Sequence, residues 1–420
     1  MSGINYLDKL LDGVAVEWPA LGEVAEVRSG WGFPNAYQGH ADGDYPFYKV
    51  SDMNIVGNET TMVTANNYID ANTIKKLGIK PAPEGTVIFP KIGAAVATNK
   101  KRLLSMPSAY DNNVMGLIAG EKVNSRFLYH WMQTINLSTL ANDSGAVPSI
   151  RKSEMEMLPV PIPCPDNPKK SLEIQAEIVR ILDAFAELTA ELTAELTARK
   201  KQYNYYRDQL LSFEGGEVEW RPLGEIAVVQ RGASPRPIAK FITDDPDGVP
   251  WIKIGDTSPG SKYVYETAQK ITKEGAKSSR ILEKGDFILS NSMSFGRPYI
   301  LEISGAIHDG WASISKFSGA LNSDFLYHYL SSNTVQNYWA GKINSGSVSN
   351  LNADIIKTLP VPIPTLVRQK SIAMLLDKFD TLTTSITEGL PREIELRQQQ
   401  YAYYRDLLLS FPKPAETAEV

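Results

Sequence analysis

The stretch Leu158-Pro159-Val160-Pro161-Ile162-Pro163 returns without a single change at positions 359–364. Five further blocks also occur twice, in the same order and at a nearly constant spacing. The first copies lie at 16–23, 46–52, 125–130, 144–147 and 203–208, and the second copies lie at 218–225, 250–256, 323–328, 345–348 and 401–406. Matched blocks in a constant order indicate an internal duplication.

A third, shorter copy of the last block stands at the start of the chain. Tyr6-Leu7-Asp8-Lys9-Leu10-Leu11 resembles the sequence at 206–211, and the same pattern closes the second half at 404–409. The first half therefore starts with the end of a helix whose main body lies elsewhere in the sequence. This arrangement predicts a near two-fold object in which one chain imitates a symmetric dimer.

Each half contains a mixed region of short strands and helices, at 18–157 and at 220–358. Apolar runs at 86–89 and 286–289 are typical of buried strands, and Gly and Pro punctuate both regions. Helices are expected at 125–133 and 323–331, with Ser125 and Ser323 as their N-caps. The proline-rich repeat cannot continue a helix and predicts an extended strap that leaves each globule.

Long helical stretches follow each mixed region. In the first, at about 171–212, apolar residues recur in steps of four and three, which is the seam of a coiled coil. These residues are Ile174, Ile178, Ile181, Phe185 and Leu188. The second stretch, at about 368–410, has a similar stripe, and a break is expected at Gly389-Leu390-Pro391. That stripe consists of Ile372, Leu375, Phe379, Leu382 and Ile386.

Three tandem copies of Ala-Glu-Leu-Thr occupy 186–197 in the first helical stretch. They place Leu188, Leu192 and Leu196 four residues apart, a spacing that locally unwinds a supercoil. One interpretation is a surface helix with an apolar stripe. The other is a spacer whose length is counted in quartets, each of which adds about 6 Å of helix.

Together these patterns predict an α+β fold: two similar globular domains separated by long helices that form an antiparallel coiled coil, with an internal pseudo-two-fold repeat. The expected segments are an N-terminal helix at 1–17, a first globule at 18–165, a central helix at 166–214, a second globule at 215–365, a C-terminal helix at 366–411 and a tail at 412–420.

Composition excludes several classes of protein. Cys164 is the only cysteine, so neither an intramolecular disulfide nor a cysteine zinc site is possible. No phosphate-binding loop, dinucleotide fingerprint, serine elbow or metal-hydrolase histidine pair is present. His130 and His328 occupy equivalent helix positions, and we interpret them as partly buried or helix-flanking residues rather than DNA or catalytic contacts. The start of the chain is acidic and no long apolar run exists, so we expect no membrane segment and a cytoplasmic protein.

Binding to DNA must come from local patches, because the formal net charge is −5. The acidic excess lies mainly in the helical and terminal parts, and the mixed regions are near neutral or slightly basic. Arginine pairs with guanine and asparagine with adenine in the major groove. The candidate contacts are Lys49, Lys91, Lys100, Lys101, Arg102, Arg231, Arg236, Lys253, Asn291, Ser292 and Arg297. Each of them could instead be a solvated surface residue.

The repeated globules, the proline-rich exits and the helix ends with Tyr-Tyr-Arg-Asp followed by leucines and Ser-Phe resemble the DNA-specificity subunits of type I restriction-modification systems. The Ala-Glu-Leu-Thr tandem and the sequence at 388–397 are similar to the type IC subgroup. Asp111 to Asn113 and Asp309 are expected to be turn or strand-edge residues rather than catalytic acids.

This resemblance implies that each globule is a target-recognition domain for one half of a bipartite, asymmetric DNA site. It implies that the helices fix the gap and dock two methyltransferase subunits, which bind S-adenosylmethionine and methylate adenine, and that motor-nuclease subunits join for cleavage. The chain itself would hold no cofactor, no metal and no catalytic residue. Seven residues could belong to the docking surface or could close the coiled coil: Leu188, Leu192, Leu196, Tyr203, Tyr206, Tyr401 and Tyr404.

Two other classes of protein fit this sequence less well. A free-standing transcription regulator would normally show a helix-turn-helix and a basic face, and neither is evident. A modification enzyme that acts alone would need a methyltransferase domain, for which this chain has no room. The quartet pattern adds a hypothesis on distance: deletion of 190–193 should shorten the preferred gap and leave both half-sites unchanged.

Overall fold

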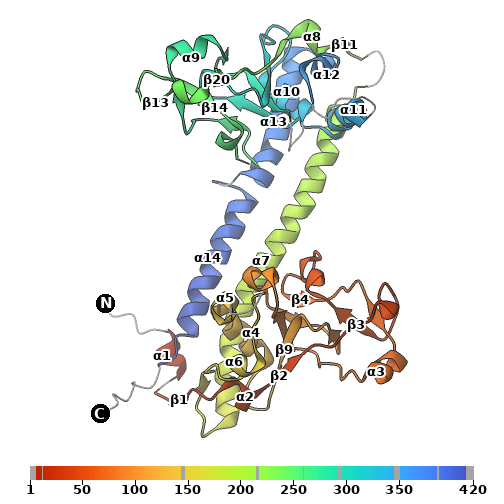
Figure 1. The fold of residues 1–420 in the computed structure, drawn as a ribbon, viewed down its shortest axis with the longest axis vertical. Helices are drawn as coiled ribbons and strands as arrows, with labels where there is room; N and C mark the ends of the chain where they lie inside the picture. Colours follow the sequence, from red (N-terminus) through yellow and green to blue (C-terminus); the bar gives the residue numbers. More distant parts are fainter. Residues whose placement is uncertain are drawn as a thin grey trace. The chain divides into compact units, whose positions relative to one another are not determined.

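The computed structural model describes residues 6–11, 13–142, 147–213, 217–258, 260–291, 296–344, 351–385 and 387–412. The chain forms two compact units, one made of Met1–Leu188 with Arg397–Val420 and the other of Thr189–Leu396 (Figure 1). Ser292, Ile386, the repeated block at 345–348, most of the block at 144–147 and the tail from 413 lie outside the described residues.

The first unit contains a five-stranded sheet and a three-stranded sheet. The larger sheet has the order β2-β9-β6-β7-β4, and the smaller one has the order β5-β3-β8. The strands are β2 (Ala25–Ser29), β3 (Tyr45–Tyr48), β4 (Thr61–Met62), β5 (Tyr68–Ile69), β6 (Val87–Pro90), β7 (Arg102–Leu104), β8 (Ala109–Tyr110) and β9 (Val114–Ala119). The helices are α1 (Tyr6–Leu11), α2 (Leu21–Val24), α3 (Ala71–Leu77), α4 (Ser125–Thr134), α5 (Leu137–Leu140) and α6 (Lys152–Glu156), with short 3-10 helices η1 (Asn35–Tyr37), η2 (Val50–Asn54) and η3 (Ala94–Thr98).

The second unit repeats this plan with two additional strands. Its sheets have the orders β12-β21-β18-β19-β15 and β13-β16-β14-β20-β17. The strands are β12 (Val228–Arg231), β13 (Ile242–Thr243), β14 (Val249–Ile252), β15 (Tyr263–Val264), β16 (Lys270–Ile271), β17 (Arg280–Leu282), β18 (Phe287–Ser290), β19 (Pro298–Leu301), β20 (Gly305–Ile307) and β21 (Trp311–Ser315). The helices are α8 (Leu223–Ile226), α9 (Lys273–Lys277), α10 (Ser323–Leu330), α11 (Asn333–Asn344) and α12 (Ala353–Lys357), with 3-10 helices η4 (Ile238–Lys240) and η5 (Ile254–Asp256).

The predicted strands and helices of the mixed regions are present. β6 and β18 are buried along their whole length, as their apolar runs indicate. The caps of α4 and α10 lie one residue earlier than predicted. Asn124 and Asn322, rather than the serines that follow them, accept the hydrogen bonds from the first free backbone N–H groups. A short amide side chain in extended conformation satisfies these donors as well as serine does.

The proline-rich repeat forms paired strands rather than a free strap. β10 (Ile162–Pro163) pairs antiparallel with β1 (Val16–Glu17), and β22 (Pro360–Ile363) pairs with β11 (Glu219–Pro222). Prolines alternate with residues that keep an N–H, and the Val160 N–H donates to the Pro19 carbonyl at 3.0 Å. Proline is tolerated in such two-stranded edges, because only alternate residues must donate.

The long helices are α7 (Pro168–Leu210), α13 (Leu366–Thr384) and α14 (Leu390–Leu408). α7 is one continuous helix that includes all three quartets. The predicted break between α13 and α14 is present, and Gly389 has the positive φ that a side chain would disfavour. One predicted seam position is wrong: Leu375 is 43% exposed, and Leu376 is buried in its place.

The helices run antiparallel in the second unit. Arg368, near the start of α13, lies over the ring of Phe213 just past α7, whereas Phe379 further along α13 stacks with Tyr203 and Tyr206 inside α7. In the first unit, the end of α14 runs beside the first part of α7, and Tyr404 stacks on Phe185 at 4.9 Å (Figure 1). Both helix pairs continue directly into the hydrophobic core of their own unit.

Candidate nucleic-acid interface

Two equivalent strand ends, one in each unit, hold four of the predicted contacts, namely Lys91, Arg231, Arg236 and Asn291. The Gly30 N–H donates to Val114 and the Gly232 N–H to Trp311, at 3.0 and 2.8 Å. One strand further, the Lys91 N–H donates to Asn113 and the Asn291 N–H to Gly310. Because these hydrogen bonds match, Lys91 of the first unit is equivalent to Asn291 of the second. In the same way, Ser29 is equivalent to Arg231, Asp111 to His308 and Asn112 to Asp309.

The backbones at these ends approach so closely that only glycine fits. A Cβ on Gly30 would lie 2.0 Å from the backbone oxygen of Asp111, and a Cβ on Gly232 would lie 2.1 Å from that of His308. The same close contact therefore holds the same turn in both units. The side chains around it are free to differ, and they do.

In the second unit, Asp309 organises the cluster. Its carboxylate accepts from Ser234 Oγ at 3.0 Å and from Arg236 Nη2 at 3.3 Å, and it lies 3.1 Å from His308 Nε2. Its backbone oxygen accepts from Arg231 Nε at 3.2 Å and from Asn291 Nδ2 at 3.4 Å. Burial raises the pKa of Asp309, but the Ser234 hydrogen bond and the neighbouring positive charges outweigh burial and hold the pKa below its ordinary value.

In the first unit, the equivalent place is less positive and more buried. Lys91 Nζ donates to Ser29 Oγ at 3.0 Å, and burial lowers the pKa of Lys91. Asp111 is buried and accepts from the backbone and side-chain nitrogens of Asn113. Burial raises its pKa above the ordinary value despite these bonds. The predicted turn or strand-edge position is confirmed in both units, since Asp111 forms an isolated bridge with Trp31 and Asp309 lies in a turn.

The remaining candidates lie elsewhere. Lys49 and Lys253 are equivalent residues before η2 and η5. The ammonium of each donates a hydrogen bond to the side-chain oxygen of a glutamine. Lys100 donates to Asn54. Arg102 is half-buried and donates to the backbone oxygens of Lys101 and Met53. Arg297 lines a cavity of about 430 Å³ beside α7 and α13.

Lys101 corrects our prediction, because its side chain has no exposed surface. The ammonium donates to Asn99 Oδ1 at 2.8 Å and to the Ile135 carbonyl at 2.6 Å. Burial lowers its pKa to about 8, and the nearby Arg405 adds to this effect. Such a residue cannot touch DNA unless the fold opens.

The tyrosines at the helix ends bind histidines inside each unit. Tyr401 Oη lies 2.9 Å from His130 Nδ1, and His130 Nε2 lies 2.8 Å from Asp183 of α7. In the second unit, Tyr203, His328 and Asp377 repeat these contacts at 2.9 and 2.8 Å. Both histidines are fully buried, whereas the prediction was a partly buried or helix-flanking position. We call each Tyr-His-Asp set a junction, since it ties the globule helix α4 or α10 to two long helices.

The other aromatic and leucine candidates stay closer to the surface. Tyr206 is partly exposed and stacks on Phe379, whereas Tyr404 stacks on Phe185. Leu188, Leu192 and Leu196 are half-buried along α7. The residues with the greater exposure are instead Tyr205 and Tyr403, at 63% and 64%, which occupy equivalent positions in the two copies.

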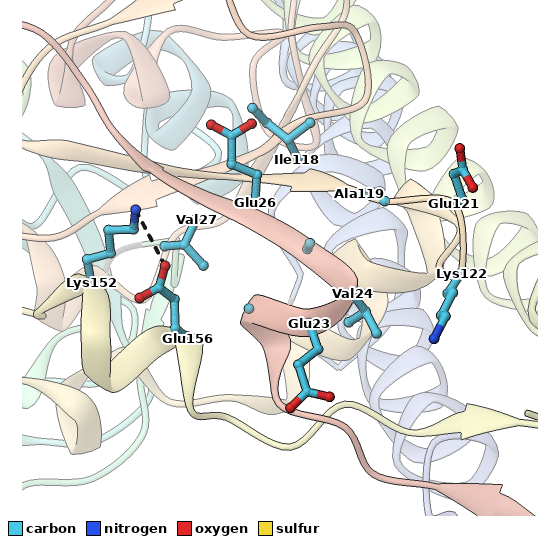
Figure 2. A pocket seen from close by; sticks show the side chains of 13 residues that line it. Glu23, Val24, Glu26, Val27, Ile118, Ala119, Glu121, Lys122, Lys152 and Glu156 are labelled. Atoms are coloured by element: carbon cyan, nitrogen blue, oxygen red, sulfur yellow. Dashed lines mark ion pairs between the residues drawn. The ribbon is translucent and has the colours of Figure 1, made fainter.

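A hollow of about 620 Å³ lies at the other end of the β2–β9 pair (Figure 2). The register of β2 and β9 shows that the hollow and the polar strand end lie at opposite ends of this strand pair. Ser29 pairs with Met115 near the polar strand end, and Ala25 pairs with Ala119 at the hollow. The hollow is lined by four glutamates and two lysines, Glu23, Glu26, Glu121, Glu156, Lys122 and Lys152. Its negative balance disfavours phosphate, so the polar strand end is the better candidate for DNA.

The family model described as the type I restriction modification DNA specificity domain matches residues 15–199 and again residues 216–396. The chain belongs to this family. Its members are the specificity subunits of type I restriction-modification systems, which recognise DNA and are not catalytic themselves. The two matches confirm the internal repeat.

Relatives of full length support the assignment. The chain is 36% identical to the Escherichia coli EcoR124I/EcoR124II specificity subunit, over 99% of both chains. It is 31% identical to a putative type I specificity subunit of Haemophilus influenzae, over 97% of this chain and 98% of that one. Among solved structures, the M. genitalium type I S subunit shares the fold, with a TM-score of 0.54 at 15% identity and coverage of 96% and 98%. A type I system chain studied for complex assembly has a TM-score of 0.61 at 15% identity, with coverage of 94% and 97%.

Neither a metal site nor a membrane segment emerges from the described parts of this specificity subunit. Within those residues, no group of three or more His, Cys, Asp or Glu is placed to hold a metal ion. No helix there is long and apolar enough to cross a bilayer.

Our sequence reasoning missed the residues that organise the strand ends, namely Ser29, Ser234 and His308. It also missed Lys262 and Arg126 at the junctions. Ser29 and Ser234 carried no motif, and their partners lie 62 and 75 residues away. The offset of the repeat could have paired Lys91 with Asn291, because both follow a buried strand directly.

Proposed function

We propose that this chain is the DNA-reading subunit of a type I restriction-modification complex, with each globule bound to one half of a bipartite, asymmetric site in double-stranded DNA. The observation that carries the proposal is the pair of equivalent strand ends. A shared backbone contact at Gly30 and Gly232 presents different side chains, and a reader of two different half-sites needs that combination.

The long helices would set the gap between the half-sites. α7 is a single helix through all three quartets, so its length follows the quartet count directly. The junctions support this role, because each ties its globule to the helices through a buried histidine. A globule held in this way would keep a fixed orientation relative to the DNA.

The chemistry would come from partners. Two methyltransferase subunits would bind S-adenosylmethionine and methylate adenine, and motor-nuclease subunits would join for cleavage. Two identical partners need two similar docking surfaces on one chain. Tyr205 and Tyr403 fit this requirement better than Tyr203 and Tyr401, because the latter pair is occupied by the junction histidines.

The reading role is tested by co-expression with the cognate methyltransferase subunit, followed by genome-wide mapping of methylated adenine. The proposal predicts a single bipartite motif with one fixed gap. An intact complex that methylates no defined motif would contradict it.

The docking role is tested by the double variant Tyr205→Ala/Tyr403→Ala. Exposed tyrosines at protein interfaces often contribute 1–2 kcal/mol or more, so about tenfold weaker binding per site is expected in a pull-down of the methyltransferase subunit. Tyr265→Ala is the matched control, since Tyr265 is equally exposed but lies on the globule. Equal binding by all three proteins would exclude the two tyrosines.

A further inference from the structure

The cluster around Asp309 holds two arginines in different ways. Arg231 lies at the end of β12 and uses Nε to donate to the backbone oxygen of Asp309. Within the described residues, its two terminal Nη groups have no partner. Arg236 uses one terminal nitrogen, Nη2, on the Asp309 carboxylate. Arg231 therefore keeps the flat end of its guanidinium open, whereas Arg236 does not.

An open guanidinium end matches one base edge better than the others. Guanine presents two acceptors, O6 and N7, side by side in the major groove, and the two Nη groups can donate to both. Adenine offers N7 beside an amino donor, and cytosine offers a donor, so neither can accept two bonds from arginine. The bond through Nε fixes the plane of the group in advance, which lowers the entropy lost on binding.

The first unit lacks this feature. Ser29 stands at the position of Arg231, and its hydroxyl is engaged by Lys91. A short hydroxyl does not reach a base edge as a long arginine does, and it does not select guanine. The pseudo-two-fold repeat thus differs at the position where a guanine contact would be made.

The following inference rests on the proposed function. We propose that Arg231 reads a guanine in the half-site bound by the second unit, and that the backbone oxygen of Asp309 positions the guanidinium. The first unit makes no such contact at the equivalent place. The two half-sites are therefore expected to differ at related positions.

The test maps methylated adenine for the complete complex with wild-type chain, Arg231→Lys, Arg231→Ala and Arg221→Ala. The wild-type motif should contain a guanine in one half. Arg231→Ala should relax that position by on the order of ten- to a hundredfold, and should leave the other half and the gap unchanged. Arg231→Lys should relax it less, because lysine can also donate to guanine O6 and N7 but lacks the Nε bond to Asp309. Arg221→Ala, the control, removes a partly exposed arginine of β11 outside the Asp309 cluster and should keep the guanine. Recovery of each variant with the methyltransferase subunit checks assembly.

The outcomes separate the two proposals. No bipartite motif with wild-type chain would contradict the proposed function itself. A bipartite motif without guanine in either half, or one that Arg231→Ala leaves unchanged, would overturn the role of Arg231 alone. If Arg231→Lys keeps full activity while Arg231→Ala weakens methylation equally at all sites, Arg231 contacts a phosphate rather than a base.

Discussion

The two junctions share one plan but use opposite charges at the same helix position. In the first unit, Arg126 of α4 lies 2.6 Å from Asp183. In the second unit, the equivalent residue of α10 is Asp324, which would repel Asp377. Lys262, just before β15, lies 2.7 Å from both acids. A reversed charge on one element is thus compensated from another element.

The comparison shows which contacts of the junction are the same in both units and which differ. The Tyr-His-Asp contacts have the same distances in both units, 2.9 Å from tyrosine to histidine and 2.8 Å from histidine to aspartate. Burial raises the pKa of Asp183 and Asp377, but hydrogen bonds from the histidines and cations hold both values below the ordinary one. The buried contact is therefore shared, and only its outer charge partner differs.

The largest effect should follow removal of the central cation in the second unit. The side chain of Lys262 is only 9% exposed, and Lys262→Ala leaves two acids facing each other. We expect a loss of about 2–3 kcal/mol in unfolding free energy, below the value for a fully buried pair because the acids are partly solvated. Chemical denaturation of the full chain measures it.

Arg126→Ala is the matched variant in the first unit. Because Arg126 is 43% exposed, its loss should cost roughly 1 kcal/mol or less. Lys262→Thr combined with Asp324→Arg converts the second junction to the first type, since Thr60 stands at the position of Lys262. This double variant should recover most of the stability. Equal losses for both single variants, or no recovery, would refute the compensation.

A smaller loss of stability, equal in the two units, is expected when the tyrosine hydroxyl of each junction is removed. Tyr203→Phe and Tyr401→Phe each remove the hydroxyl that faces a buried histidine nitrogen. An unsatisfied buried polar atom costs about 1–2 kcal/mol. The two variants should lose the same unfolding free energy within about 0.5 kcal/mol in parallel denaturation curves. A clear difference between them would show that the junctions are not equivalent.

The smallest expected effect is on the pH dependence of the unfolding free energy, to which a buried lysine contributes in the first unit only. Lys101 is buried in the first unit with its pKa lowered to about 8. The strand registers place Pro298 at the equivalent position in the second unit. Between pH 8 and the ordinary lysine value near 10.4, the unfolded chain binds more protons than the folded one, so stability rises with pH. The gain is on the order of 1 kcal/mol per pH unit.

Calorimetry of wild type and Lys101→Met at pH 8 and pH 9 measures this gain. Only the wild type should show the rise, because the methionine cannot titrate. If both proteins respond to pH in the same way, Lys101 is not the source.

Much of this fold could be predicted from the sequence, because duplication made each signal appear twice. Buried strands such as 86–89, the helix that carries His130 and the break at Gly389 all follow from local pattern. Lys262 could not be predicted, since its partners Asp324 and Asp377 lie 62 and 115 residues further along the chain and no pattern links them. Lys101 misled us because a lysine beside Lys100 and Arg102 reads as a surface patch. Only tertiary packing could reveal its burial.

The candidate site was only partly predictable for the same reason. Arg231, Arg236 and Asn291 were recognised by residue type, and the structure brings them together around Asp309. Residue type alone did not separate them from Arg297, which faces a different cavity. That distinction depends on which strand end each loop reaches.

The most direct test of the account removes one quartet, 190–193, and maps methylated adenine with the methyltransferase subunit present. Loss of about 6 Å of helix should shorten the gap by on the order of one base pair, since base pairs stack at ~3.4 Å. The account predicts two unchanged half-sites separated by a shorter gap. An unchanged gap, or a change in either half-site, would contradict two independent readers held apart by α7.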